Sequence, residues 1–146
     1  MNVTDPTGIK KVAWKRMVKS ANEKASKEYY RNEAATKRKL EELNKYKTEI
    51  VREKYLSSLS WKDARTIFNA RTRMTKMAAN YKGSNEDTKC PRCQDKMDNE
   101  KHLIDECPRT NKEKIGVRYS HVLDGDTEPK DLRKIAEYIR LNTEDQ

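Results

Sequence analysis

Glycine, proline and apolar residues are all scarce in this sequence of 146 residues. Four Gly and four Pro in the whole chain argue against a β-sandwich and against a low-complexity linker. Hydrophobic residues make up 34% of the chain and charged residues 39%. Typical globular domains have about 45–50% and about 25%. The core must therefore be small, and we expect a metal ion or a partner surface to add stability.

The sequence also contains no run of about eighteen apolar residues, so neither a transmembrane helix nor a membrane partner is predicted. The first residues, from Met1 to Pro6, lack the apolar stretch of a signal peptide. An intracellular location, in the nucleus or the cytoplasm, is therefore expected. In that reducing setting the three cysteines are not expected to form disulfides, and an odd number of them fits disulfide pairing poorly.

Acidic residues are scarce in the first part of the chain, which makes the distribution of charge uneven. The formal net charge is +9. Residues 1–89 carry 22 Lys or Arg and 11 Asp or Glu, a net of +11, whereas residues 90–146 carry 11 and 13, a net of −2. Nucleic acid is the commonest polyanion for such a protein, so the N-terminal part is predicted to bind it. The alternative is a solvated helical surface.

Three cysteines and one histidine lie within eighteen positions at the spacing of metal ligands. Two residues separate Cys90 from Cys93, so both sulfur atoms can reach one metal ion from a single turn. His102 and Cys107 are five positions apart, so a helical turn with a loosened end can direct both at the same point. Three sulfur atoms and one imidazole nitrogen make a closed tetrahedral site. We therefore predict one structural Zn²⁺ ion.

Four protein ligands leave no open coordination position, so a catalytic zinc is not expected. His121 is the remaining histidine, and we expect it to be at the surface or hydrogen bonded. Asp98 is expected to cap the short helix that carries His102. The sequence contains no nucleophile–base pair and no glycine loop for phosphate binding, so no enzymatic activity is predicted.

Helix-forming residues fill a stretch without Gly or Pro from residue 9 to residue 82, which predicts two or three consecutive helices. Ser60 followed by Asp63 is typical of a capping box at a helix start. Pro129 opens a last helix over residues 130–141. The apolar face of that helix comprises Leu132, Ile135, Ala136 and Ile139. The expected fold is mostly α, with consecutive helices followed by a small CCHC zinc knuckle and a C-terminal helix.

Basic residues next to the cysteine cluster are the candidates for contacts with phosphate groups. Arg71, Arg73 and Lys76 are expected to form a row on a helix that leads into the knuckle, with Arg73 and Lys76 on one face. Lys82, Lys89 and Arg92 are expected to assist them. For this row too, a solvated helix face is the alternative.

Aromatic residues lie among the basic residues, an arrangement that suits stacking on single-stranded nucleic acid. These aromatic residues are Trp14, Tyr29, Tyr30, Trp61 and Phe68. At helical spacing, however, an aromatic residue more often packs in a core, and we expect that role for most of them.

The order of the motifs along the chain resembles that of a known family. Arg71-Thr72-Arg73-Met74 is followed by Asn80-Tyr81-Lys82, then by Cys90-Pro91-Arg92-Cys93, His102-Leu103 and Cys107-Pro108. This order resembles the C-terminal zinc-knuckle (CCHC-type) region of non-LTR retrotransposon (LINE-type) reverse transcriptases. The resemblance implies binding and positioning of nucleic acid, with RNA or an RNA–DNA junction as the preferred ligand.

The resemblance covers roughly residues 40–110 and has two departures. Those enzymes usually have an acidic–threonine pair just before the histidine, where this chain has Asn99-Glu100-Lys101. Their catalytic fingers and palm, with the aspartate pair, are absent altogether. The resemblance therefore implies no polymerase activity in this chain.

The composition and the motifs divide the chain into four segments. We expect a basic helical arm at 1–35, a helical segment at 36–87, the zinc knuckle at 88–110, and a C-terminal segment with a helix at 111–146. The first functional hypothesis is a zinc-stabilised nucleic-acid-binding module that derives from or belongs to a retroelement reverse transcriptase. The alternative is a structural or adaptor subunit that docks on a protein partner through its N-terminal arm or C-terminal helix. The uneven charge favours the first hypothesis and the small core favours the second.

Overall fold

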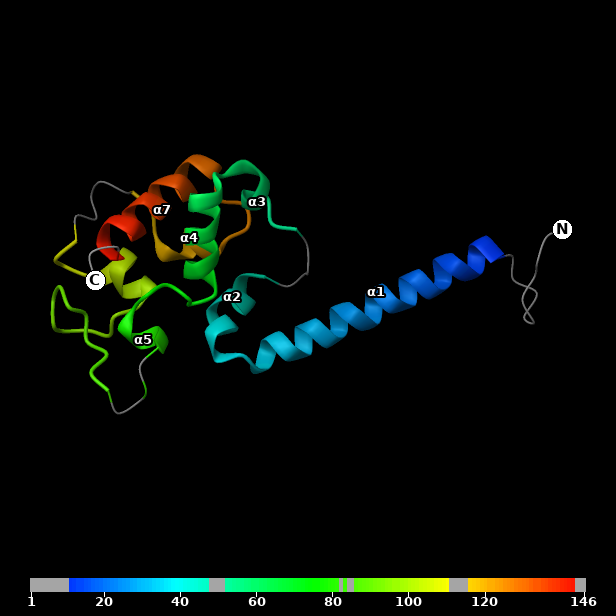
Figure 1. The fold of residues 1–146 in the computed structure, drawn as a ribbon, viewed down its shortest axis with the longest axis horizontal. Helices are drawn as coiled ribbons and strands as arrows, with labels where there is room; N and C mark the ends of the chain where they lie inside the picture. The colour runs from blue at the N-terminus through cyan, green and yellow to red at the C-terminus, as the bar shows by residue number, and fades with distance from the viewer. Residues whose placement is uncertain (1–10, 48–51, 82, 84–85, 111–115, 144–146) are drawn as a thin grey trace. The chain divides into compact units, whose positions relative to one another are not determined.

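The computed structural model describes residues 11–47, 52–81, 83, 86–110 and 116–143. The chain divides into two units, residues 1–36 and residues 37–146 (Figure 1). Within the described residues every named element is helical, and the β pairing is a single isolated bridge between Lys89 and Met97. The prediction of a mostly helical fold is therefore confirmed. No helix among the described residues has the length and apolar character needed to cross a membrane.

The first unit contains the helix α1, Lys11–Thr36, which has 26 residues (Figure 1). Neither Gly nor Pro interrupts this helix, and the ion pair between Lys19 and Glu23 on its surface adds to its stability. None of its residues is buried. Its large apolar side chains are therefore all solvent accessible, among them Trp14, Met17 and Tyr29.

The second unit contains the remaining named elements. They are η1 (Arg38–Leu40), α2 (Glu41–Tyr46), α3 (Tyr55–Ser58), α4 (Trp61–Arg71), α5 (Ala78–Tyr81), η2 (His102–Glu106), α6 (Tyr119–Leu123) and α7 (Pro129–Thr143). The helices α4 and α7 pack side by side and form the centre of the unit (Figure 1). The short elements η2 and α6 add Leu103 and Val122 to the same core.

The apolar face predicted for the last helix is confirmed in α7. Its buried residues are Leu132, Ile135, Ala136 and Ile139. They face the buried side of α4, where Ile67 and Ala70 have no exposed surface. The core is small, as the composition predicted, because the sequence has few apolar residues that could enlarge it.

Ser60 is confirmed as the residue that caps α4. Its hydroxyl accepts a hydrogen bond from the backbone N–H of Asp63 at 3.2 Å. The Asp63 carboxylate does not complete a capping box, because it accepts from the Ser60 hydroxyl at 2.7 Å and from Arg140 Nη1 at 2.7 Å. The carboxylate therefore connects the start of α4 to the last turns of α7.

Candidate metal centre

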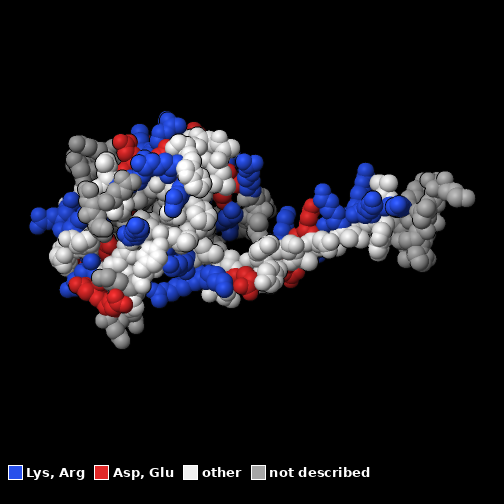
Figure 2. All heavy atoms as spheres, in the orientation of Figure 1, with Lys and Arg blue, Asp and Glu red and all other residues white. Residues whose placement is uncertain are grey.

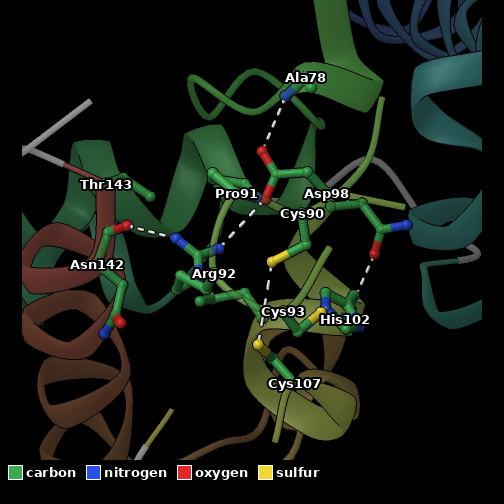
Figure 3. Close-up of polar contacts among 12 residues, drawn as sticks. Ala78, Cys90, Pro91, Arg92, Cys93, Asp98, His102, Cys107, Asn142 and Thr143 are labelled. Atoms are coloured by element: carbon green, nitrogen blue, oxygen red, sulfur yellow. Dashed lines mark hydrogen bonds and ion pairs between the residues drawn. The ribbon is translucent and has the colours of Figure 1, made fainter. Parts of the chain in front are cut away.

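Cys90 and Cys93 lie in a tight turn of the backbone between the bridged residues Lys89 and Met97. The N–H of Cys90 donates to the carbonyl of Lys96 at 2.8 Å, and the N–H of Gln94 donates to the carbonyl of Cys90 at 2.9 Å. Gln94 has a positive φ of 58°, which reverses the chain directly after Cys93. This turn brings both thiol groups to the same side of the chain (Figure 3).

His102 and Cys107 lie at the two ends of a widened helical turn, η2. The N–H of Cys107 donates to the carbonyl of His102 at 2.7 Å, a bond across five residues that defines a π-type turn. Two helical residues, Glu100 and Lys101, precede η2, and Asn99 caps this start with its Oδ1, which accepts from the N–H of His102 at 2.8 Å. The prediction that Asp98 caps this helix is wrong by one position. Asn99 has the side-chain oxygen that lies three residues before His102.

The four candidate ligands converge on one point. Their ligand atoms all lie within 4.8 Å of one another. The Cys90 and Cys107 Sγ atoms are 3.9 Å apart, and Cys93 Sγ is 3.2 Å from Nε2 of His102. A tetrahedral zinc site requires about 3.8 Å between sulfur atoms and about 3.5 Å between sulfur and nitrogen. The residues therefore lie close enough to hold a metal ion, and the three cysteines are free thiols.

Backbone groups of the turn favour the thiolate form of Cys93. The backbone N–H groups of Lys96 and Asp95 lower the pKa of Cys93 to about 6, below the ordinary value of a thiol. Burial acts in the opposite direction at Cys107 and raises its pKa. The pKa values of Cys93 and Cys107 are thus shifted in opposite directions, and a bound cation would offset the burial of negative charge at Cys107.

A carboxylate lies near the second ring nitrogen of His102. Nδ1 of His102 is buried without a hydrogen bond and lies 3.9 Å from Oε2 of Glu106. The Glu106 carboxylate pairs with Lys96 at 3.1 Å. Ligand histidines usually direct their second ring nitrogen at a carboxylate or carbonyl oxygen, which fixes the tautomer. Glu106 could have been identified from the sequence, because it follows His102 by one helical turn.

Asp98 and Arg92 connect the cysteine turn to the rest of the unit (Figure 3). Asp98 is only 1% exposed. Its Oδ2 accepts a hydrogen bond from the N–H of Ala78 at 3.0 Å, and its Oδ1 accepts one from Arg92 Nη2 at 3.2 Å. Arg92 Nη1 donates to the carbonyl of Asn142 at 2.8 Å. Both terminal nitrogens of Arg92 are therefore bonded within the protein. The prediction that Arg92 contacts phosphate is corrected, because its guanidinium holds α7 instead.

Arg71 is also corrected as a phosphate contact. Its side chain is 4% exposed, with Nη1 donating to Glu53 Oε2 at 2.9 Å and Nη2 to the carbonyl of Leu123 at 2.6 Å. The guanidinium also lies over the ring of Tyr55, 5.1 Å from its centroid. Arg71 therefore neutralises a carboxylate inside the unit, and its buried guanidinium is not accessible to a ligand.

Of the remaining candidates for phosphate contacts, Arg73, Lys76 and Lys89 do not lie on a helix. The helix α4 ends at Arg71, and Arg73 has a positive φ of 53°, so the predicted helical row is wrong. Arg73 is half-buried, whereas Lys76 and Lys89 are exposed. Lys82 lies outside the described residues. On the face shown in Figure 2, basic side chains are distributed over both units.

A second buried carboxylate was not predicted. Glu100 is fully buried, and one of its oxygens accepts from Asn80 Nδ2 at 2.7 Å. Burial raises the pKa of Glu100. Its partner lies twenty residues earlier in the chain, so no local pattern could have identified this contact.

His121 has the hydrogen-bonded role expected for it. Its Nδ1 accepts from the backbone N–H of Arg118 at 2.9 Å. Among the described residues, the one group with metal-ligand geometry is the cluster of three cysteines and His102. His121 is therefore not part of the metal centre.

Comparison of this chain with models of known protein families, with curated proteins and with solved structures gives no match. The functional assignment therefore rests on the geometry and charge of the chain's own residues.

Proposed function

We propose that Cys90, Cys93, His102 and Cys107 bind one structural Zn²⁺ ion. The convergence of their four ligand atoms within 4.8 Å is the observation that carries this proposal. Three thiolates and one imidazole are the donor set that zinc prefers, and they fill a tetrahedral shell. The ion would therefore stabilise the fold, with no coordination position left for chemistry.

We further propose that the chain is a nucleic-acid-binding module that derives from or belongs to a retroelement reverse transcriptase and has no polymerase activity itself. Three observations support this. The net charge of residues 1–89 is +11. Lys76 and Lys89 are exposed, Lys89 directly precedes Cys90 in the chain, and Arg73 is partly exposed. The motif order resembles that of LINE-type enzymes, which is why RNA or an RNA–DNA junction is the preferred ligand.

A salt titration tests the nucleic-acid proposal. Contacts with phosphate release counterions, so the affinity for RNA should fall steeply as the salt concentration rises. The affinity should depend little on the RNA sequence, because phosphate contacts carry no sequence information. Absence of RNA binding at low salt would contradict the proposal.

The exposed apolar side chains of α1 favour a second candidate function, that of a structural or adaptor subunit that docks on a protein partner. None of the 26 residues of α1 is buried, although the helix carries Trp14, Met17 and Val18. Apolar side chains that are exposed in this way are common at protein–protein interfaces. A protein that lacks affinity for RNA but forms a stable complex through α1 would support this candidate.

A further inference from the structure

The helix α4 has an aromatic and basic face that is exposed to solvent beside the face that packs in the core. Its buried residues include Ala64, Ile67 and Ala70, which pack toward α7. Trp61 is 78% exposed and Phe68 is 47% exposed, and Arg65 between them is exposed as well. Residues four and three positions apart lie on one face of a helix. We refer to Trp61, Arg65 and Phe68 as the α4 strip.

The exposure of the two aromatic rings requires an explanation. A tryptophan is normally buried for most of its surface, and large apolar side chains that cluster at the surface commonly mark a binding site. Helical spacing alone predicts a core position for such residues. In this structure the core side of α4 is filled by Ala64, Ile67 and Ala70, and neither Trp61 nor Phe68 belongs to the buried core.

The exposed charged residues of α4 itself are all positive. Lys62 and Arg65 are exposed, and Arg65 forms no ion pair with any residue of the part of the chain that the structure describes. Asp63, the one acidic residue of α4, is buried and paired with Arg140 at 2.7 Å. No carboxylate of α4 itself therefore competes with an anionic ligand.

We propose that the α4 strip is a stacking platform for single-stranded nucleic acid. With a rise of 1.5 Å per residue, Arg65 lies about 6 Å along the axis from Trp61, and Phe68 lies about 10 Å from it. Two bases can stack on the two rings while the guanidinium contacts the phosphate between them. Paired bases in a duplex are already stacked on each other, so the platform selects unpaired strands. This inference rests on the proposed nucleic-acid function and adds a surface separate from Arg73 and Lys76.

Other occupants fit the strip less well. The helix α1 carries seven Lys or Arg and three Glu, so its charge has the same sign as that of the strip. A second copy of α4 would bring Arg65 against Arg65. A single-stranded nucleic acid supplies bases that can stack on the two rings, together with the negative charge that the strip lacks.

Tryptophan fluorescence tests the proposal in the full-length protein. The chain has two tryptophans, so Trp14→Phe leaves Trp61 as the single reporter. In the free protein acrylamide should quench Trp61 efficiently. Addition of an unstructured oligouridine should quench the emission further and protect the indole from acrylamide, whereas an RNA duplex should do so much less. An indole that acrylamide does not reach in the free protein would overturn the proposal, because the strip would then be covered.

Alanine variants separate this inference from the proposed function. Trp61→Ala and Phe68→Ala should each weaken oligouridine binding about fivefold or more and leave duplex binding nearly unchanged. Trp14→Ala is the matched control. Both side chains are exposed, so the melting temperature and the metal content should not change. Normal RNA affinity in both variants would overturn the platform and leave the proposed function intact. Absence of all RNA binding by the unmodified protein would overturn both.

Discussion

Arg92 Nη1 donates to the backbone carbonyl of Asn142 at 2.8 Å, and this bond joins the turn between two candidate ligands to the end of α7. The same guanidinium pairs with the buried carboxylate of Asp98. Because α7 also supplies Ile135 and Ile139 to the core, the metal centre and the core share one helix. Metal binding and the folding of the second unit should therefore be coupled.

Metal removal should destabilise the whole second unit. A chelator, or the variant Cys107→Ser, should abolish metal binding and lower the melting temperature of α4 and α7 as well as of residues 88–107. Elemental analysis and circular dichroism measure the two effects. His121→Ala is the control and should retain the metal, since its ring lies outside the cluster. A freshly purified protein without zinc would contradict this prediction.

Arg92→Ala should lower stability without a specific effect on RNA binding. The substitution leaves the carboxylate of Asp98 buried without its guanidinium partner, at a cost of about 1–3 kcal/mol. Urea unfolding measures this loss. Lys96→Ala is a suitable comparison, because it also removes one positive charge from the turn but its pair with Glu106 is more exposed. A loss of RNA affinity in Arg92→Ala far beyond that of Lys96→Ala would restore the phosphate-binding role.

Leu132→Asp should unfold or strongly destabilise the second unit. Leu132 is buried in the face of α7 that packs in the core, and an unpaired charge there costs several kcal/mol. Leu141→Asp provides the control on the same helix, since Leu141 is 70% exposed. The melting temperatures of the two variants should differ by well over about ten degrees, because a loss of several kcal/mol in the free energy of unfolding produces such a shift in a domain of this size. Equal melting temperatures would show that α7 does not support the fold.

The carboxylate of Glu53 should make stability depend on pH. Burial alone would raise the pKa of Glu53, but hydrogen bonds from Lys47 and Arg71 outweigh it and hold the pKa below 4.5. The ionised form therefore adds stability above that value, and this contribution is lost as the pH falls through the lower folded pKa. Urea unfolding at neutral and acidic pH should show a smaller decline for Glu53→Gln than for the unmodified protein. Glu41→Gln, at an exposed position, should leave the decline unchanged.

Replacement of Arg73 and Lys76 by alanine should weaken binding to all RNA sequences alike. Each lost phosphate contact should lower the slope of log affinity against log salt by about one. The variant Lys130→Ala/Lys134→Ala removes the same charge from α7 and should have a smaller effect. A changed sequence preference at constant salt slope would mean that Arg73 or Lys76 contacts bases. Unchanged affinity would favour the structural-subunit alternative.

Local patterns were sufficient wherever neighbours in sequence decide the structure. The spacing of Cys90 and Cys93, and of His102 and Cys107, depends on single turns, so the cluster could be predicted. The buried face of α7 follows from helical periodicity, and the Ser60 cap follows from a hydrogen bond across three residues.

The tertiary structure alone decided which basic and aromatic side chains face solvent. Arg71 and Arg92 resemble their exposed neighbours in sequence, but their partners Leu123 and Asn142 lie 52 and 50 residues away. A guanidinium is buried only where a distant carbonyl or carboxylate replaces its hydration, and no local pattern contains that information. Trp61 and Phe68 are exposed for the converse reason, because aliphatic residues of α6, α7 and η2 already fill the core beside α4.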